Sequence, residues 1–213
     1  IEAPVVITSL EAAELIKYAA NAFLATKITF INEIANLCDA IGCDVHEVAR
    51  GMGMDNRIGR KFLHPGPGYG GSCFPKDTRA LTTLADQFGV ETRIVDAVIE
   101  ANDLQRRAMN PKIEKLLGSL EGRTIGVLGL SFKPETDDIR ESPAIEICHS
   151  LIEKGSIVRA FDPVAMEESK HFIKGIEYAS DEYDAIKGAD ALVILTEWNQ
   201  FRSLDLEKVK SLL

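Results

Sequence analysis

The sequence predicts an α/β protein in which a helical domain is followed by a doubly wound, Rossmann-like domain with a parallel sheet. Helical patterns, including one long uninterrupted pattern near the N-terminus, account for the chain up to about residue 110. After that point apolar strand runs alternate with helices, which is typical of a parallel sheet. We therefore divide the chain into a helical domain, residues 1–110, and an α/β domain, residues 111–213.

The longest helical pattern covers residues 10–41, where glycine and proline are both absent. At 1.5 Å per residue, such a helix would be about 48 Å long. Thr8 and Glu11 are spaced as a capping box at its start. An apolar stripe along the helix must be covered by the rest of the domain or by another subunit, and we expect a homodimer through this helix. The stripe consists of Leu24, Ile28, Ile31, Ile34 and Cys38.

Two further helices are predicted in the helical domain. Asp44 is a suitable cap for a short helix that ends near residues 51–53. Another helical pattern covers residues 92–109. Because proline lacks an N–H group and clashes within a helix, we expect Pro111 to break this pattern before it resumes at residues 112–117. The predicted domain boundary lies at this break.

A segment rich in glycine and proline, residues 65–71, precedes a helical pattern that begins at Pro75 and stops at Gly89. Such a segment disfavours regular structure and lets backbone amides approach a ligand closely. Cys73 lies between the two, just before a predicted helix N-terminus. The helix dipole and the nearby Lys76 favour the thiolate there, which is the nucleophilic form of cysteine. The alternative interpretation is a buried and unreactive thiol.

The α/β domain shows three buried-strand runs and two clear helices. Between them, residues 165–179 fit no clear element. The sequence GVLGL in the first strand lacks the full G-x-G-x-x-G fingerprint, so we do not infer NAD binding from it. Ligands of such sheets bind at the carboxyl ends of the strands. The predicted strands are residues 124–130, 157–161 and 191–196, and the helices are residues 143–154 and 184–187.

Composition excludes several function classes. The 213 residues carry a net charge of −9, which argues against nucleic acid or an anionic membrane as a partner. No apolar run is long enough to cross a bilayer and no signal-peptide pattern is present, so we expect a cytoplasmic protein. The four cysteines show no C-x-x-C spacing and the four histidines are scattered. We therefore expect reduced thiols and no metal site.

Four motifs resemble one enzyme family. The segment GYGGSCFPKD around Cys73 closely resembles the active-site signature of the nucleotide-sugar 6-dehydrogenases. KYAANAF near the N-terminus, RIG at residues 57–59 and FK…DIRES at residues 132–142 are similar to further segments of the family. Members that act on N-acetylated UDP-hexosamines usually carry histidine before the cysteine. Ser72 stands here, so the resemblance is greatest to the members that act on UDP-glucose.

The resemblance implies an NAD-dependent, two-step oxidation of the C6 alcohol of UDP-glucose to UDP-glucuronate. Cys73 would form a thiohemiacetal and then a thioester with the sugar. Lys17 would stabilise the developing oxyanion, and Asn21 would orient the substrate or a water molecule. Asp77 would activate or position the water. From spacing alone, Lys17 and Asn21 are ordinary helix-surface residues and Asp77 is a first-turn carboxylate that complements the helix dipole.

The resemblance also implies binding residues in both domains. Lys76 and Arg140 would contact NAD, and Arg57 would reach across the dimer to the substrate of the partner. His64 occupies a position where other members can have lysine. Further substrate contacts, largely through the backbone before the cysteine, would come from Phe62, Leu63, His64, Pro65, Gly66, Gly70, Phe132 and Lys133.

We expect the chain to be a fragment. No segment resembles the NAD-binding domain of the family, which would precede Ile1, and the α/β domain, which would bind UDP, is expected to be incomplete at its C-terminus. The chain alone is therefore expected to be inactive. Two alternatives stay open: a GDP-mannose or UDP-N-acetylhexosamine 6-dehydrogenase, and a dimeric module that binds nucleotide sugars without catalysis.

Overall fold

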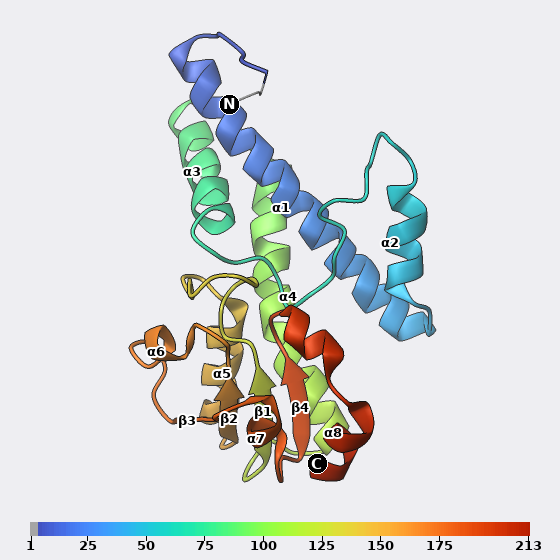
Figure 1. Ribbon diagram of the computed structural model, residues 1–213. Coiled ribbons are helices and arrows are strands. Elements are labelled where there is room, and N and C mark those ends of the chain that lie inside the picture. The colour runs from blue at the N-terminus through green and yellow to red at the C-terminus, as the bar shows by residue number, and fades with distance from the viewer. Residues whose placement is uncertain (1–3) are drawn as a thin grey trace.

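A computed structural model describes residues 4–213 as a helical part joined to a sheet-containing part (Figure 1). Four helices precede the first strand, and after it strands and helices alternate to the end of the chain. The predicted fold class, a helical region followed by a parallel sheet with helices, is confirmed.

The long helix α1 (Leu10–Ile41) forms without interruption, as predicted. Its start at Leu10 is as predicted, but the capping residue is Ser9 and not Thr8. The Ser9 hydroxyl accepts a hydrogen bond from the Ala12 N–H at 3.2 Å. Gly42 ends the helix in a left-handed conformation with φ 76°, which glycine adopts without steric cost.

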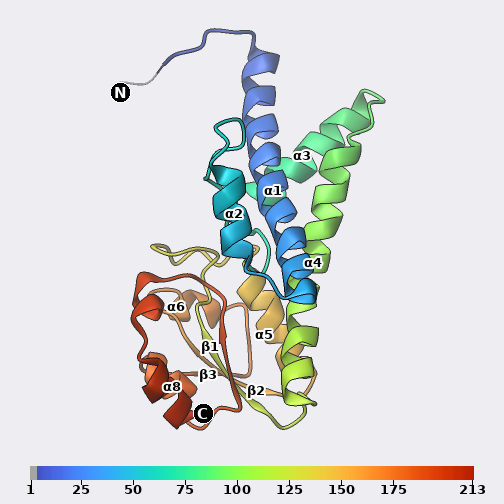
Figure 2. The ribbon, with the colours of Figure 1, turned by 90° about the vertical axis from the view of Figure 1, so that its right-hand side faces the viewer.

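Helices α2 (Val45–Gly53) and α3 (Phe74–Gln87) pack against α1. Figure 2 shows α2 on one side of α1 and α3 on the other. The side chain of Asp44 caps α2 by accepting from the His46 N–H at 2.8 Å, as predicted. Cys73 directly precedes α3, so its predicted position before a helix N-terminus is confirmed.

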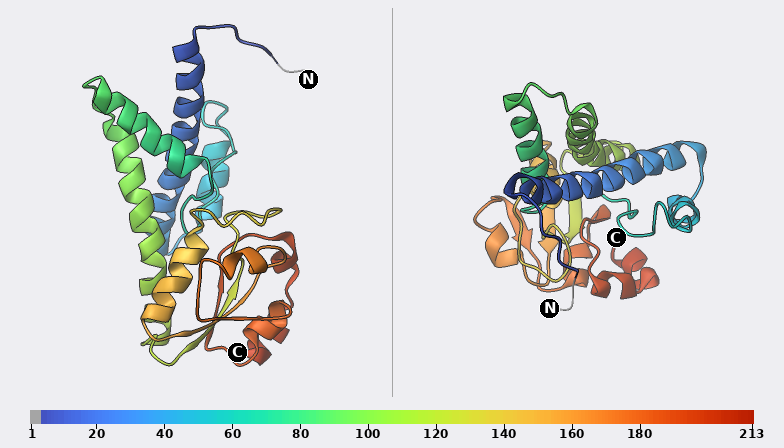
Figure 3. Two further views of the ribbon diagram at one scale, coloured as in Figure 1. Left: turned by 90° about the vertical axis from the view of Figure 1, so that its left-hand side faces the viewer. Right: turned by 90° about the horizontal axis from the view of Figure 1, so that it is seen from above.

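Helix α4 (Arg93–Leu117) is continuous through Pro111, so the predicted break is wrong. Tertiary contacts hold the residues that follow the proline. The Lys112 ammonium donates to Asp39 on α1 at 2.8 Å, and Ile113 is buried in the core of the α/β domain. These contacts outweigh the single hydrogen bond that a proline removes. Figure 3 shows α4 running from the helical part down along the sheet-containing part, across the predicted boundary.

Four parallel strands form the sheet in the order β3-β2-β1-β4. Strands β1, β2 and β4 lie within the predicted ranges. The strand order reverses direction between β1 and β4, as in doubly wound folds, and ligands of such folds bind at the carboxyl ends of these strands. Strand β3 and the short helix before it were not predicted. The bounds are β1 (Thr124–Leu128), β2 (Ile157–Phe161), β3 (Ile176–Tyr178), β4 (Ala191–Ile194) and α6 (Met166–Ser169).

Helices cover both faces of the sheet. Ile125 and Val127 of β1 belong to a core that α5 and the end of α4 complete. Leu128 belongs to a second core on the other face, which includes Ile186 and Trp198. None of the helices among residues 4–213 combines the length and apolarity needed to cross a membrane. The remaining helices are α5 (Pro143–Glu153), α7 (Glu182–Ile186), η1 (Asn199–Ser203) and α8 (Leu206–Leu212).

Gly126 of β1 leaves no room for a side chain beneath α7. A Cβ atom at this position would lie 2.8 Å from the carbonyl oxygen of Ala185. We predict that Gly126→Ala lowers the free energy of unfolding by about 1–3 kcal/mol, because a packed core has to shift to admit a methyl group. Urea unfolding measures the change. Gly51→Ala in α2 is the control, since its Cβ would point into open space and alanine favours a helix. Equal stability of the Gly126 variant and the wild type would contradict the predicted close approach.

Candidate active site

Three of the four predicted catalytic residues meet where α1 packs against α3. Lys17 and Asn21 lie one turn apart on α1, and Asp77 lies in the first turn of α3. The Asp77 Oδ2 atom accepts from Lys17 Nζ at 2.9 Å and from Asn21 Nδ2 at 2.5 Å. Its other oxygen accepts from the neighbouring Lys76. One carboxylate thus joins two helices, and its side chain is 0% exposed.

The charges in this cluster are set by one another. Burial opposes ionisation of Asp77, but the donors Lys17, Lys76 and Asn21 outweigh it and lower the pKa of Asp77 to about 2. The hydrogen bond to Asp77 in turn raises the pKa of Lys17. Lys17 remains 61% exposed. At neutral pH the cluster therefore presents an ammonium group to solvent above a buried carboxylate, which suits the binding of a developing negative charge.

Cys73 is exposed and lies one helical turn from Asp77. Its carbonyl oxygen accepts from the Asp77 N–H at 2.9 Å. Lys17 from the helical domain and Arg140 from the α/β domain are both close enough for electrostatic interaction with Cys73. The structure thus brings the predicted nucleophile into the same site as the other three predicted catalytic residues.

The glycines before Cys73 are required by close contacts within the protein. A Cβ atom on Gly70 would lie 2.2 Å from the Glu141 carbonyl oxygen, and one on Gly71 would lie 2.5 Å from the Phe132 ring. The Gly71 N–H donates to the Arg140 carbonyl oxygen at 3.0 Å. Sequence analysis assigned the flexible backbone to ligand approach. In the structure, this loop packs its backbone against the α/β domain.

The loop that leads to the glycines is fixed by side chains that sequence analysis missed. Gly66 donates to Asn32 Oδ1 at 2.8 Å, and its carbonyl accepts from Gln105 Nε2 at 2.9 Å. Asn102 makes two hydrogen bonds to the backbone of Tyr69, at 2.7 and 3.2 Å. These amides are all buried. Buried amides have no distinctive local pattern, so only the fold identifies them.

The predicted substrate residues of this loop have different surroundings. Leu63 is buried in a core beside Ile31, so its side chain serves packing. Phe62 adopts a left-handed backbone conformation with φ 63° and packs edge-on against Phe74. His64 is exposed and Pro65 is partly buried. Only the backbone of Leu63 remains for the predicted ligand contact.

The two arginines predicted to bind ligands, Arg57 and Arg140, each pair with the aspartate two residues earlier in the chain. Arg57 is 89% exposed and binds Asp55 through two nitrogen atoms. Arg140 binds Asp138 in the same way, at 2.9 and 2.7 Å. Among residues 4–213 no hydrogen bond or ion pair joins Arg57 to the cluster around Asp77, whereas Arg140 lies beside the cysteine loop.

Phe132 and Lys133 follow β1 at the carboxyl edge of the sheet. The Lys133 ammonium lies 5.3 Å from the centre of the Phe132 ring, and this ring covers Gly71. The two residues thus stand at the junction of the two domains. Within the described part of the chain, no group of three or more histidine, cysteine or acidic side chains is arranged to hold a metal ion.

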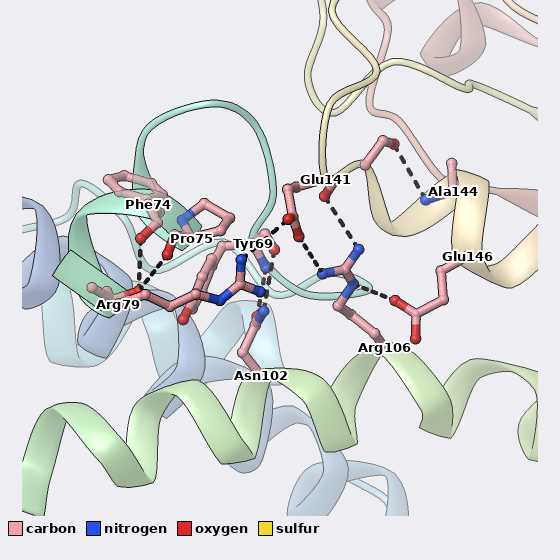
Figure 4. Close-up of polar contacts among 11 residues, drawn as sticks. Tyr69, Phe74, Pro75, Arg79, Asn102, Arg106, Glu141, Ala144 and Glu146 are labelled. Carbon is pink, nitrogen blue, oxygen red and sulfur yellow. Dashed lines mark hydrogen bonds and ion pairs between the residues drawn. The ribbon is translucent and has the colours of Figure 1, made fainter. Parts of the chain in front are cut away.

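A network of charges that sequence analysis missed crosses the same junction (Figure 4). Arg106 on α4 is only 8% exposed and pairs with Glu141 and with Glu146 on α5. Arg79 on α3 pairs with the same Glu141 at 3.1 Å. Glu141 belongs to the DIRES segment, but its partners are far away in the sequence, so no local pattern indicated its contacts.

Comparisons with known proteins match both parts of the chain. The model of the central domain of the UDP-glucose/GDP-mannose dehydrogenase family matches residues 11–104. The model of the UDP binding domain of the same family matches residues 126–213.

Individual relatives are similar over nearly the whole chain. The UDP-glucose 6-dehydrogenase of Rhizobium meliloti is 53% identical over 211 residues, which cover 99% of this chain and 48% of the relative. UDP-glucose 6-dehydrogenase TuaD of Bacillus subtilis is 52% identical, over 99% of this chain and 46% of the relative. A solved UDP-glucose dehydrogenase from Pyrobaculum islandicum is 41% identical with a TM-score of 0.93, over 96% of this chain and 48% of that chain. The chain spans about half the length of these relatives.

We predict that Asp77→Asn destabilises the protein at neutral pH by about 1–3 kcal/mol, because Lys17, Lys76 and Asn21 lose a buried, charged acceptor. The pKa of Asp77 is about 2 in the folded protein and about 3.9 when unfolded. The stabilisation is therefore complete above the unfolded value and is lost as the pH falls through about 4 to 2. Urea unfolding at pH 7, 4 and 3 should show the difference between variant and wild type shrinking with acidity. Asp86→Asn, on the exposed end of α3, is the control. A difference that does not depend on pH would refute the charged role of Asp77.

Proposed function

Because the chain belongs to the UDP-glucose/GDP-mannose dehydrogenase family, we propose that the protein oxidises the C6 alcohol of UDP-glucose to UDP-glucuronate in two NAD-dependent steps. The observation that carries the proposal is the cluster of Lys17, Asn21 and Asp77 beside the exposed Cys73. UDP-glucose is the proposed substrate because the two bacterial relatives, each more than half identical to this chain, are named for it.

In the proposed reaction, Cys73 holds the sugar between the two oxidations. The first oxidation removes a hydride from C6 and a proton from its hydroxyl, which gives an aldehyde. The Cys73 thiolate attacks the aldehyde carbon, a C–S bond forms, and the oxygen gains a proton to give a thiohemiacetal. The second oxidation removes the hydride that remains on this carbon and the hydroxyl proton, which leaves a thioester. Water attacks the thioester, the C–S bond breaks, and the uronate and the free thiol are released.

The polar cluster stabilises charge in these steps. Lys17 donates to the oxygen that becomes negative when sulfur or water attacks the carbon. Asn21 orients the attacking water. Asp77 is a weak base, because its pKa is about 2, so we assign it the positioning of Lys17 and Asn21 in preference to proton abstraction.

The residues present fit NAD as the hydride acceptor. NAD supplies the chemistry of both oxidations by accepting a hydride in each. Lys76 and Arg140 are exposed cations on the Cys73 side of the molecule, and cations of this kind bind the phosphates of a dinucleotide. Each also pairs with a carboxylate of its own domain, which holds its side chain in place.

The carboxyl edge of the sheet fits the nucleotide of the substrate. Phe132 and Lys133 follow β1, where the strand order reverses toward β4, and nucleotides bind at such points in doubly wound sheets. The Lys133 ammonium suits the diphosphate and lies by the Phe132 ring, which packs against Gly71 of the cysteine loop. Because a catalytic thiol must stay reduced, we place the protein in the cytoplasm.

We predict that Cys73→Ser in the full-length protein abolishes UDP-glucuronate release, because the hydroxyl cannot replace the thiolate as a nucleophile at neutral pH. The wild type should form two NADH per UDP-glucose consumed, measured by absorbance and by chromatography of the sugar nucleotides. The variant should form at most one NADH per sugar. Normal release of UDP-glucuronate by the variant would refute the covalent role of Cys73.

The same assay tests the substrate and the need for further domains. GDP-mannose and UDP-N-acetylhexosamines should react more slowly than UDP-glucose. The 213-residue chain alone should form no NADH, and binding of UDP-glucose without turnover would identify it as a sugar-nucleotide module of the larger enzyme. A faster reaction with one of the other sugars would replace the proposed substrate.

We also propose that two copies associate through α1. Ile16, Phe23, Phe30 and Leu37 are all exposed and recur every seven residues, so they lie along one side of the helix. A continuous exposed apolar stripe of this kind is typical of a helix that packs against another subunit. The stripe differs from the predicted one, whose members Ile31 and Cys38 are buried within the same chain.

We predict that Phe30→Glu converts the full-length dimer to monomers, because the interface would have to bury an unpaired carboxylate. Size-exclusion chromatography with light scattering measures the mass. Phe88→Glu is the matched control, since Phe88 is an exposed phenylalanine just after α3 and is not a member of this stripe. A Phe30→Glu variant that stays dimeric would place the interface elsewhere.

A further inference from the structure

The turn that ends at Ser142 brings the α/β domain against the cysteine loop. Glu141 in this turn has a left-handed backbone conformation with φ 53°. A residue with a long side chain adopts this conformation only where its surroundings hold it.

Two arginines from two different helices hold Glu141 (Figure 4). Arg79 on α3 pairs with one carboxylate oxygen at 3.1 Å, and Arg106 on α4 pairs with the other at 3.5 Å. Arg106 also donates to the Glu141 carbonyl oxygen at 3.3 Å. The buried Arg106 is fixed from its other side by Glu146 on α5, at 2.8 Å. Glu141 is thus held through both its side chain and its backbone.

These contacts determine how the two sides of the site meet. The Glu141 carbonyl faces Gly70, where no side chain could fit, and the preceding Arg140 carbonyl accepts from Gly71. Cys73 follows these glycines, and Arg79 belongs to the helix that begins just after it. Glu141 therefore contacts the loop before the thiol and the helix after it, while the carbonyl of its chain neighbour Arg140 binds the same loop at Gly71.

We propose that Glu141 is a positioning residue that, through Arg79 and Arg106, locks the loop of Phe132 and Arg140 in the α/β domain against the loop of Cys73. Its carboxylate is occupied by the two arginines, so it acts through them and not on the substrate. The inference rests on the proposed function, because it assigns a new role within the same site. Glu141 is not one of the four residues to which the proposed reaction assigns a chemical role, which are Cys73, Lys17, Asn21 and Asp77.

The first test is Glu141→Gln in the full-length protein, which keeps the shape of the side chain and removes its charge. With UDP-glucose and NAD, kcat should fall about tenfold or more, because a small misplacement of reacting groups is costly. The KM for UDP-glucose should stay within about threefold, since the groups that bind the sugar remain. Glu114→Gln is the matched control: it breaks another ion pair of α4, with Lys154 just after α5 at 2.8 Å, and should leave kcat unchanged. An unchanged kcat in the Glu141 variant would overturn the proposal.

A double-mutant cycle separates positioning from general loss of stability. Arg79→Gln should lower kcat, because it removes one of the two arginines that hold Glu141. The double variant should be no worse than Glu141→Gln alone, because both substitutions break the same Arg79–Glu141 pair. Additive losses would refute a role through Arg79. If Glu141→Gln does not fold, the exposed Arg79→Gln variant tests the same interaction alone.

Alkylation of Cys73 by iodoacetamide, followed by mass spectrometry, tests the inference without the reaction. The thiol should be alkylated severalfold faster in Glu141→Gln and Arg79→Gln than in the wild type and in Glu114→Gln, because its loop is no longer held. Equal rates would overturn the inference. If the wild type forms no NADH from UDP-glucose while the alkylation rates differ as expected, the proposed function fails and the role of Glu141 stands.

Discussion

The carboxylate of Asp77 has lost all contact with water, and donors from two helices replace that contact. A buried charge without partners is costly, so the position of α3 is tied to Lys17 and Asn21 on α1. Because Cys73 immediately precedes α3, the same interaction places the thiol relative to the Lys17 ammonium. The arrangement of the whole candidate site depends on this one contact between helices.

The second constraint is that two residues of the cysteine loop carry no side chain where the loop meets the α/β domain. Gly70 and Gly71 let the cysteine loop approach Glu141 and Phe132 at distances that no larger residue permits. The buried Arg106 lies in the same region, and its positive charge is paired with Glu141 and Glu146. Asp77 thus orders the helical side of the site, and the glycines and the arginines connect that side to the sheet.

Local patterns predicted most elements, and the errors have physical causes. The cap of α1 was misplaced by one residue because Thr8 and Ser9 are both suitable caps, and only the formed helix selects Ser9. The predicted break at Pro111 did not occur because the residues after the proline are held by both domains. Lys112 binds Asp39 of the helical domain, and Ile113 is buried in the core of the α/β domain. Strand β3 was missed because three residues are too few to show a period.

The sequence by itself determined the order of the longer helices and strands, the site of Cys73 before a helix, and the family resemblance, because these depend on neighbours in the chain. Only the tertiary structure decided that Asp77 is buried, that the glycines serve packing between domains, and that Glu141 joins two arginines. Asp77 lies 60 residues from Lys17, and Arg79 lies 62 residues from Glu141. Contacts over such separations have no local pattern and arise only when the packed elements bring their side chains together.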